Sequence, residues 1–260
     1  MTTFDISTTP PPSFARLVRV ELRKTYDTRA GFWLLAIIGI LVLAAEAIIL
    51  AVTATQNKDI SFGDFVGVSA FITSIFLPVL GILLVTSEWS QRTAMVTFAL
   101  EPRRNRVILA KLATGFVLTL ITAAAAVALG AVLNLVSFAI QGDGSWSFGW
   151  RFFFGFLIVQ SATMAGGFAL GTLLLSTPAA LVVFFVYKWA LPGLLFAGAH
   201  AWTWLHDLGP WINFQDSLTS AGSMTLDSGA KWGQLLVSGT VWLLLPLAIG
   251  MRRILRAEVK

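Results

Sequence analysis

Residues 32–54 read FWLLAIIGILVLAAEAIILAVTA, an unbroken apolar stretch whose single ionisable side chain is Glu46. A helix needs about 20 such residues to cross the hydrocarbon core of a bilayer, where only a helix or a closed barrel satisfies its own backbone. The sequence contains five further stretches of this kind. The six predicted spans cover approximately residues 32–54, 65–87, 108–140, 150–176, 179–200 and 232–251. The apolar runs are continuous rather than alternating, which excludes a porin-type barrel. The sequence therefore predicts an all-α integral membrane protein with six transmembrane helices.

The composition separates this chain from soluble proteins. Hydrophobic residues make up 57% of the 260 residues and charged residues only 12%, whereas a soluble domain carries roughly 25% charged residues. The net charge of +5 would point to nucleic acid in a soluble protein. Here the basic residues flank the apolar stretches, so the lipid bilayer is an expected partner and nucleic acid is not. The absence of Cys excludes disulfides and thiolate metal sites.

Lys and Arg gather on alternate sides of the apolar stretches. Three clusters, before the first stretch, between the second and third, and after the last, hold 14 of the 18 basic residues: Arg16, Arg19, Arg23, Lys24 and Arg29; Arg92, Arg103, Arg104, Arg106 and Lys111; Arg252, Arg253, Arg256 and Lys260. The loops of opposite parity carry only Lys58, Arg151 and Lys231. Cytoplasmic loops retain Lys and Arg. The pattern predicts that both termini are cytoplasmic.

The residues before the first apolar stretch divide into two parts. Residues 1–12 are polar and rich in proline, so a disordered cytoplasmic tail is expected, followed by a single transmembrane domain over 13–260. From Ser13 onward, the helical spacing gives one apolar and one basic face: Phe14, Leu17, Val18 and Leu22 against Arg16, Arg19 and Arg23. Such a helix tends to lie in the membrane plane. The alternative is a solvated helix that only anchors topology.

One predicted cytoplasmic loop is large enough to bind a partner. Residues 87–111 read SEWSQRTAMVTFALEPRRNRVILAK. Glu88 and Arg92 are spaced i, i+4, which supports a helical turn. Met95, Phe98 and Ala99 then present an apolar face, and Pro102 ends the segment. A short amphipathic helix of this kind can dock into a groove on another protein.

The order of residues in this loop resembles the permeases of type 2 ABC exporters. An acidic residue ends the second span, followed by Arg92-Thr93, an apolar turn, the basic run after Pro102, and Lys111 entering the third span. The resemblance covers nearly the whole chain: an in-plane N-terminal helix, six spans and a broken outer segment before the last span. The family often has a glycine before the threonine, where this chain has Arg92.

The resemblance implies a coupling helix, roughly Glu88 to Leu100, that contacts a separate ABC ATPase subunit. The residues implied in this contact are Glu88, Arg92, Thr93, Phe98, Leu100, Pro102, Arg103 and Arg104. It further implies a second permease copy, as a homodimer or heterodimer, with the substrate path between the two copies, and a bacterial plasma membrane location. The alternative is that these charges are solvated determinants of topology.

The chain itself is not expected to be an enzyme. No Gly-Lys-Ser or Gly-Lys-Thr occurs, so the phosphate-binding loop is missing, and ATP and Mg would be bound by the partner subunit. No metal site is expected either, because His200 and His206 are six residues apart and do not share a helix face well. The alternative function is a stand-alone membrane protein without an ATPase partner, either a secondary transporter or an immunity-type protein.

Two ionisable residues, Glu46 and Lys188, lie deep within apolar stretches. A charge near the middle of a bilayer costs at least ~2.5–3.5 kcal/mol on insertion scales, so each should face protein or water. We hypothesise that they face the protein interior or the transport path and approach each other. The alternative is that Lys188 snorkels and Glu46 is reached by water from the outer leaflet.

The longest outer segment, 199–231, is too apolar for a free loop. It contains Trp202, Trp204 and Trp211, and Gly209-Pro210 interrupts it. Tryptophan is enriched at the headgroup level of membranes. The sequence predicts broken outer helices that dip into the outer interface before the sixth span.

Overall fold

This computed structural model describes residues 12–56, 58–141, 145–147 and 149–256. Within them the chain is helical without β-strands, and six segments are long and apolar enough to cross a membrane: α2 (Arg29–Gln56), α3 (Phe62–Ser90), α5 (Arg104–Gln141), α6 (Trp150–Leu174), and the segments Thr177–Ala201 and Gly229–Arg256. The prediction of an all-α, six-span membrane protein is confirmed. The largest error in bounds is at the end of the last span, predicted at residue 251 and observed at Arg256. The predicted tail, 1–12, lies outside the described residues except for Pro12.

The centre of the bundle is the pair α3 and α6. Helix α3 begins with a capping box in which Ser61 and Asp64 satisfy each other's backbone N–H groups. The two helices approach through glycines, since Gly81 lies against the backbone of Met164 and Phe168, and Gly167 lies against Pro78. Small residues allow such close approach in membrane helices. Helices α2 and α5 pack on α3, whereas α12 packs on α6.

The fifth and sixth spans each contain a π-helical turn near the middle. Their parts are α7 (Thr177–Phe185), η1 (Val186–Ala190) and α8 (Leu191–Ala201), and α11 (Gly229–Gly239), η2 (Thr240–Leu244) and α12 (Leu245–Arg256). Tyr187 of η1 stacks on Trp242 of η2 with ring centroids 4.7 Å apart. Trp242 Nε1 also donates to the Ile212 carbonyl at 2.9 Å. The two irregular turns therefore lie side by side and are tied to the outer segment.

The segment before the sixth span, which the sequence predicts to be on the outer side, contains two short helices, α9 (Thr203–Ile212) and α10 (Phe214–Gly222). Helix α10 packs on α6, and its Phe214 and Leu218 are buried. The segment is therefore broken into helices, as the sequence predicts, while its depth in the membrane stays a prediction.

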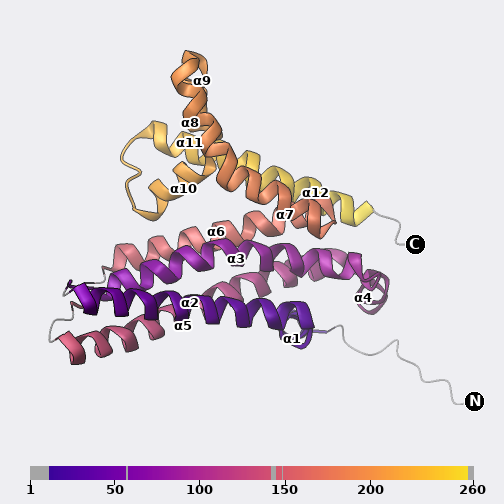
Figure 1. The fold of residues 1–260 in the computed structure, drawn as a ribbon. Coiled ribbons are helices and arrows are strands. Elements are labelled where there is room, and N and C mark those ends of the chain that lie inside the picture. Colours follow the sequence, from indigo (N-terminus) through magenta and orange to yellow (C-terminus); the bar gives the residue numbers. More distant parts are fainter. Residues whose placement is uncertain (1–11, 57, 142–144, 148, 257–260) are drawn as a thin grey trace, which may run out of the picture.

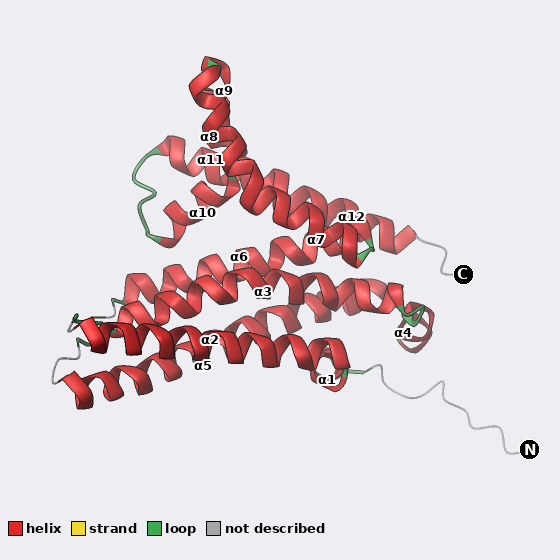
Figure 2. Cartoon of the chain, in the orientation of Figure 1, coloured by secondary structure: helices red, strands yellow, loops and turns green. Residues whose placement is uncertain are grey.

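The two remaining helices, α1 (Phe14–Asp27) and α4 (Ala94–Leu100), lie at one end of the bundle together with the end of α12 (Figure 1). The first residues of α3 and α6 lie at the opposite end, and few of the described residues are in loops (Figure 2). The described members of all three basic clusters are thus brought to the end that carries α1 and α4.

Candidate functional site

The connection from α3 to α4 is a tight turn at Gln91–Thr93. Arg92 has a left-handed backbone with φ 58°, and the Thr93 N–H donates to the Glu88 carbonyl at 2.9 Å. The prediction of one continuous helix from Glu88 to Leu100, with Glu88 and Arg92 on the same helical turn, is therefore wrong. Glu88 belongs to the last turn of α3, and the backbone reverses at Arg92 because a left-handed residue cannot continue a right-handed helix.

Replacing Arg92 by glycine is expected to stabilise this turn. A left-handed backbone costs an L-residue with a Cβ about 1 kcal/mol or more, and glycine does not incur that cost. Arg92→Gly should raise the thermal unfolding midpoint of the detergent-purified protein, and Arg92→Val should lower it. Gln91→Gly is the matched control, because Gln91 has φ −90° and gains nothing from glycine. An Arg92→Gly protein no more stable than Gln91→Gly would contradict this reading of the turn.

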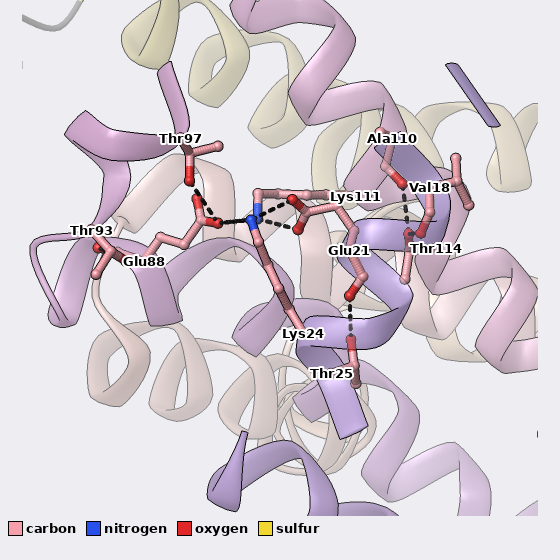
Figure 3. A network of polar contacts seen from close by, with 10 residues as sticks. All are labelled: Val18, Glu21, Lys24, Thr25, Glu88, Thr93, Thr97, Ala110, Lys111 and Thr114. Carbon is pink, nitrogen blue, oxygen red and sulfur yellow. Dashed lines mark hydrogen bonds and ion pairs between the residues drawn. The ribbon is translucent and has the colours of Figure 1, made fainter. Parts of the chain in front are cut away.

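Four charged residues from α1, α3 and α5 meet beneath this turn (Figure 3). We call Glu21, Lys24, Glu88 and Lys111 the charge cluster. Lys24 Nζ lies 2.7 Å from Glu21 Oε1 and 2.8 Å from Glu88 Oε1. Lys111 Nζ lies 2.6 Å from Glu21 Oε2 and 3.0 Å from Glu88 Oε1. Each ammonium thus bridges both carboxylates, which joins the N-terminal helix to two spans.

The charge cluster is largely removed from solvent and balanced in charge. Glu21, Glu88 and Lys111 are buried, while the Lys24 side chain remains 40% exposed. Burial alone would lower the pKa of Lys24, but the carboxylates of Glu21 and Glu88 outweigh it and raise that pKa. Removing one partner from a buried ionic network leaves an uncompensated charge. The cluster therefore holds α1 firmly at one position on α3 and α5.

Helix α4 is attached to the charge cluster by its inner face. Ala94 is buried, and the Thr97 hydroxyl donates to Glu88 Oε1 at 3.2 Å. Phe98 packs against the core, with the Arg104 guanidinium 5.0 Å from its ring. Phe98, selected from the sequence as a docking residue, thus faces inward. Its exposed apolar residues are Met95, Val96, Ala99 and Leu100; Leu100 is 79% exposed, and Val96 and Leu100 also border the cavity described below.

The basic residues at the start of α5 are also bound to neighbouring elements. Arg104 Nη1 donates to the Ile254 carbonyl of α12 at 2.9 Å. Arg106 pairs with Glu101 at 3.0 Å and donates to the Pro12 carbonyl at 2.7 Å. Among the residues predicted to contact an ATPase, Pro102 and Arg103 remain exposed beside α4.

A cavity of about 550 Å³ opens between α1, α3, α4 and α5. The charge cluster forms part of its wall, and the rest is mainly apolar: Leu17 and Val20 of α1, Leu83 and Leu84 of α3, Val96 and Leu100 of α4, and Val107 of α5. A displacement of α4 would change this cavity and stretch the Thr97–Glu88 hydrogen bond. Helix α4 is therefore connected through Glu88 to α1 and to the spans α3 and α5.

Helix α1 uses the centre of its apolar face for packing. Leu17, Val18 and Leu22 are half-buried, whereas Phe14 at its start is 43% exposed. The basic face is exposed throughout: Arg16, Arg19 and Arg23. Thr114 of α5 donates to the Val18 carbonyl at 3.3 Å. The position of α1 in the plane of a membrane stays a prediction.

The two deep charges, Glu46 and Lys188, are both buried, but they do not pair with each other. Glu46 accepts a hydrogen bond from the Ser69 hydroxyl on α3. Lys188 Nζ donates to the Ser74 carbonyl at 2.7 Å. Because they bind different residues of α3, the hypothesised approach of the two charges is not observed.

Sequence reasoning missed the acidic half of the charge cluster on α1. From the sequence alone, Glu21 has no assigned role, Lys24 is a determinant of topology, and Lys111 contributes to topology and to the family resemblance. A signal was present, because Glu21 lies at the middle of the apolar face formed by Leu17, Val18 and Leu22 at helical spacing. A carboxylate in that position requires a buried cationic partner.

No family model matches this chain, and no curated protein is similar enough to count as a relative. Among the described residues, no group of three or more His, Asp or Glu side chains is arranged to hold a metal ion. The candidate site is therefore defined by its geometry alone. It consists of the exposed apolar residues of α4 and the buried charge cluster to which α4 is attached.

Proposed function

We propose that this chain is the membrane subunit of an ATP-driven ABC exporter. Two copies would form the substrate path, and a separate ATPase subunit, which binds ATP and Mg, would drive it. The protein would lie in the bacterial plasma membrane with both termini in the cytoplasm. The single observation that carries this proposal is the exposed apolar face of α4, placed at the basic end of the bundle.

Two features of α4 favour a protein partner over lipid. The helix follows the last turn of α3 and lies between Arg92 and the basic segment that begins at Arg103, so charged groups flank it on both sides. Exposed apolar patches rimmed by polar residues are typical of protein interaction sites. A short helix can dock its apolar face into a groove of a partner.

The attachment of α4 favours a coupling role. Its inner face is bound to Glu88, which in turn binds Lys24 of α1 and Lys111 of α5. A partner that pushes on the outer face would therefore act on three other elements at once. An anchor that served only topology would not need this connection.

The test is co-purification of the tagged full chain with its candidate ATPase from the same operon or genome neighbourhood. Val96→Asp and Leu100→Asp are expected to abolish binding of the ATPase, because each places a carboxylate in the apolar contact, while the membrane protein stays folded. Lys58→Ala is the matched control, since it makes the same change in net charge at the opposite end of the bundle.

Two results would contradict the proposal. One is that no ATPase co-purifies with the wild-type chain, which would make the stand-alone membrane protein the better explanation. The other is that Val96→Asp and Leu100→Asp both retain the ATPase, which would place the contact elsewhere than on α4.

A further inference from the structure

Lys188 carries an ammonium group into the middle of the bundle without an acidic partner. The residue lies near the centre of the span Thr177–Ala201, and Ser74, whose carbonyl accepts its hydrogen bond at 2.7 Å, lies near the centre of α3. Only 9% of Lys188 is exposed. No carboxylate of the described residues forms an ion pair with this ammonium. The ammonium N–H groups that do not bind Ser74 are therefore available to a ligand near the middle of the span.

The side chain does not snorkel to either membrane surface. Eleven to thirteen residues separate Lys188 from the two ends of its span, which corresponds to about 16–20 Å of helix. A lysine side chain is too short to cover that distance, and its Nζ is held at the level of Ser74. The charge therefore stays deep, where ionisable residues mark the paths of substrates and ions.

The acidic residues of the six spanning segments do not offer a counter-charge to Lys188. The only acidic residues in the six spanning segments are Glu46, Asp64 and Glu88. Asp64 and Glu88 are in the first and last turns of α3, and Glu46 is fully buried against Ser69. Ser69 and Ser74 are five residues apart, or about 140° around the helix axis. Glu46 and Lys188 thus lie on different sides of α3.

The surroundings of Lys188 fit the apolar body of a ligand with a charged head. Its Nζ lies 5.8 Å and 6.0 Å from the ring centroids of Phe184 and Trp189. The Trp189 ring meets the Phe71 ring of α3 edge-on, with the ring centroids 6.2 Å apart. Both residues are more than half exposed on the surface of the bundle. An apolar chain lying on these rings would bring an attached anionic group toward the ammonium.

We propose that Lys188 forms a mid-membrane site for the anionic head group of an amphipathic molecule, a carboxylate or phosphate on a hydrocarbon body, with the Ser74 carbonyl holding the ammonium in place. This inference rests on the proposed export function, because a cargo crossing the membrane must pass this depth. Lys188 supplies the positive charge, and the Phe71 and Trp189 rings contact the hydrocarbon. The site would select anionic over neutral or cationic cargo of the same length.

The full chain, purified without any ATPase into phosphatidylcholine nanodiscs, is titrated with radiolabelled laurate, and dodecyl phosphate, dodecanol and dodecylamine are used as competitors. Laurate and dodecyl phosphate are expected to bind at least about tenfold more tightly than dodecanol. Lys188→Met should remove this preference and leave dodecanol binding unchanged, whereas Lys188→Arg should retain it. Lys231→Met, a lysine at the start of the sixth span, is the matched control.

Competition by added phosphatidylglycerol would identify a membrane lipid as the source of the anionic head, and its absence would identify single-chain amphiphiles. Equal affinity of the wild type for laurate and dodecanol would overturn the site, as would an unchanged preference in Lys188→Met. The comparison of laurate with dodecanol binding to the wild type tests the site even where a variant fails to fold. Because no ATPase is present, failure here is distinguishable from failure of the α4 contact.

Discussion

Replacing Gly167 by valine is expected to prevent the formation of a stable bundle. A Cβ at this position would lie 2.7 Å from the backbone C and Cα atoms of Pro78 on α3. Backbone atoms of a helix cannot move aside as a flexible side chain does, so α3 and α6 would have to separate. Overpacking of this kind costs about 3 kcal/mol or more. The expected result is a large loss of monodisperse protein after detergent extraction and a lower unfolding midpoint.

Gly39→Val and Gly193→Val are the matched controls. Both glycines lie within spanning segments, and a Cβ at either position has no neighbour within 4 Å. These variants should be extracted and should unfold like the wild type. A Gly167→Val protein with the same yield and midpoint as the controls would show that α3 and α6 do not pack as closely as described.

Replacing Lys111 by methionine is expected to detach α1 from the bundle. The variant keeps most of the side-chain volume but leaves Glu21 and Glu88 to share Lys24. Breaking a buried ionic network by removing one partner costs about 3–5 kcal/mol. The expected results are a lower thermal midpoint and rapid proteolysis between α1 and α2, measured on the detergent-purified chain.

A second substitution separates lost charge balance from lost packing. Glu88→Gln combined with Lys111→Met removes one charge of each sign, so this double variant should be more stable than Lys111→Met alone. Arg19→Met is the matched control, because Arg19 is an exposed basic residue of α1. A double variant no more stable than Lys111→Met would contradict the ionic account of this junction.

The spans could be predicted from the sequence because length and apolar character are local properties. The apolar stretch around Glu46 required a helix of a certain length, and α2 has it. The break at Arg92 could not be predicted in the same way, since the i, i+4 spacing of Glu88 and Arg92 is compatible with a helix. In the structure the Glu88 carboxylate pairs instead with Lys24 and Lys111. These residues are far from Glu88 in the sequence, so no local pattern indicates the pairing.

Which residues of the short helix α4 face the core could not be predicted from the sequence either. Phe98 and Leu100 are both apolar residues of one seven-residue helix, and the sequence treats them alike. Their difference arises from tertiary contacts, because Arg104 and the core cover Phe98, while Leu100 has no such cover. Likewise, nothing local indicates that Glu46 and Lys188 bind to different sides of α3.

The paired π-helical turns restrict how the lengths of the last two spans can vary. A π turn closes on an i→i+5 hydrogen bond and so takes up one more residue than an α turn. Losing one residue from η1 alone would return it to an α turn, which keeps α7 and α8 nearly in register but removes the π geometry in which Tyr187 stacks on Trp242. A loss from η2 would likewise remove the π geometry around Trp242. Insertions and deletions in these two spans are thus linked, although 55 residues of sequence separate Tyr187 from Trp242.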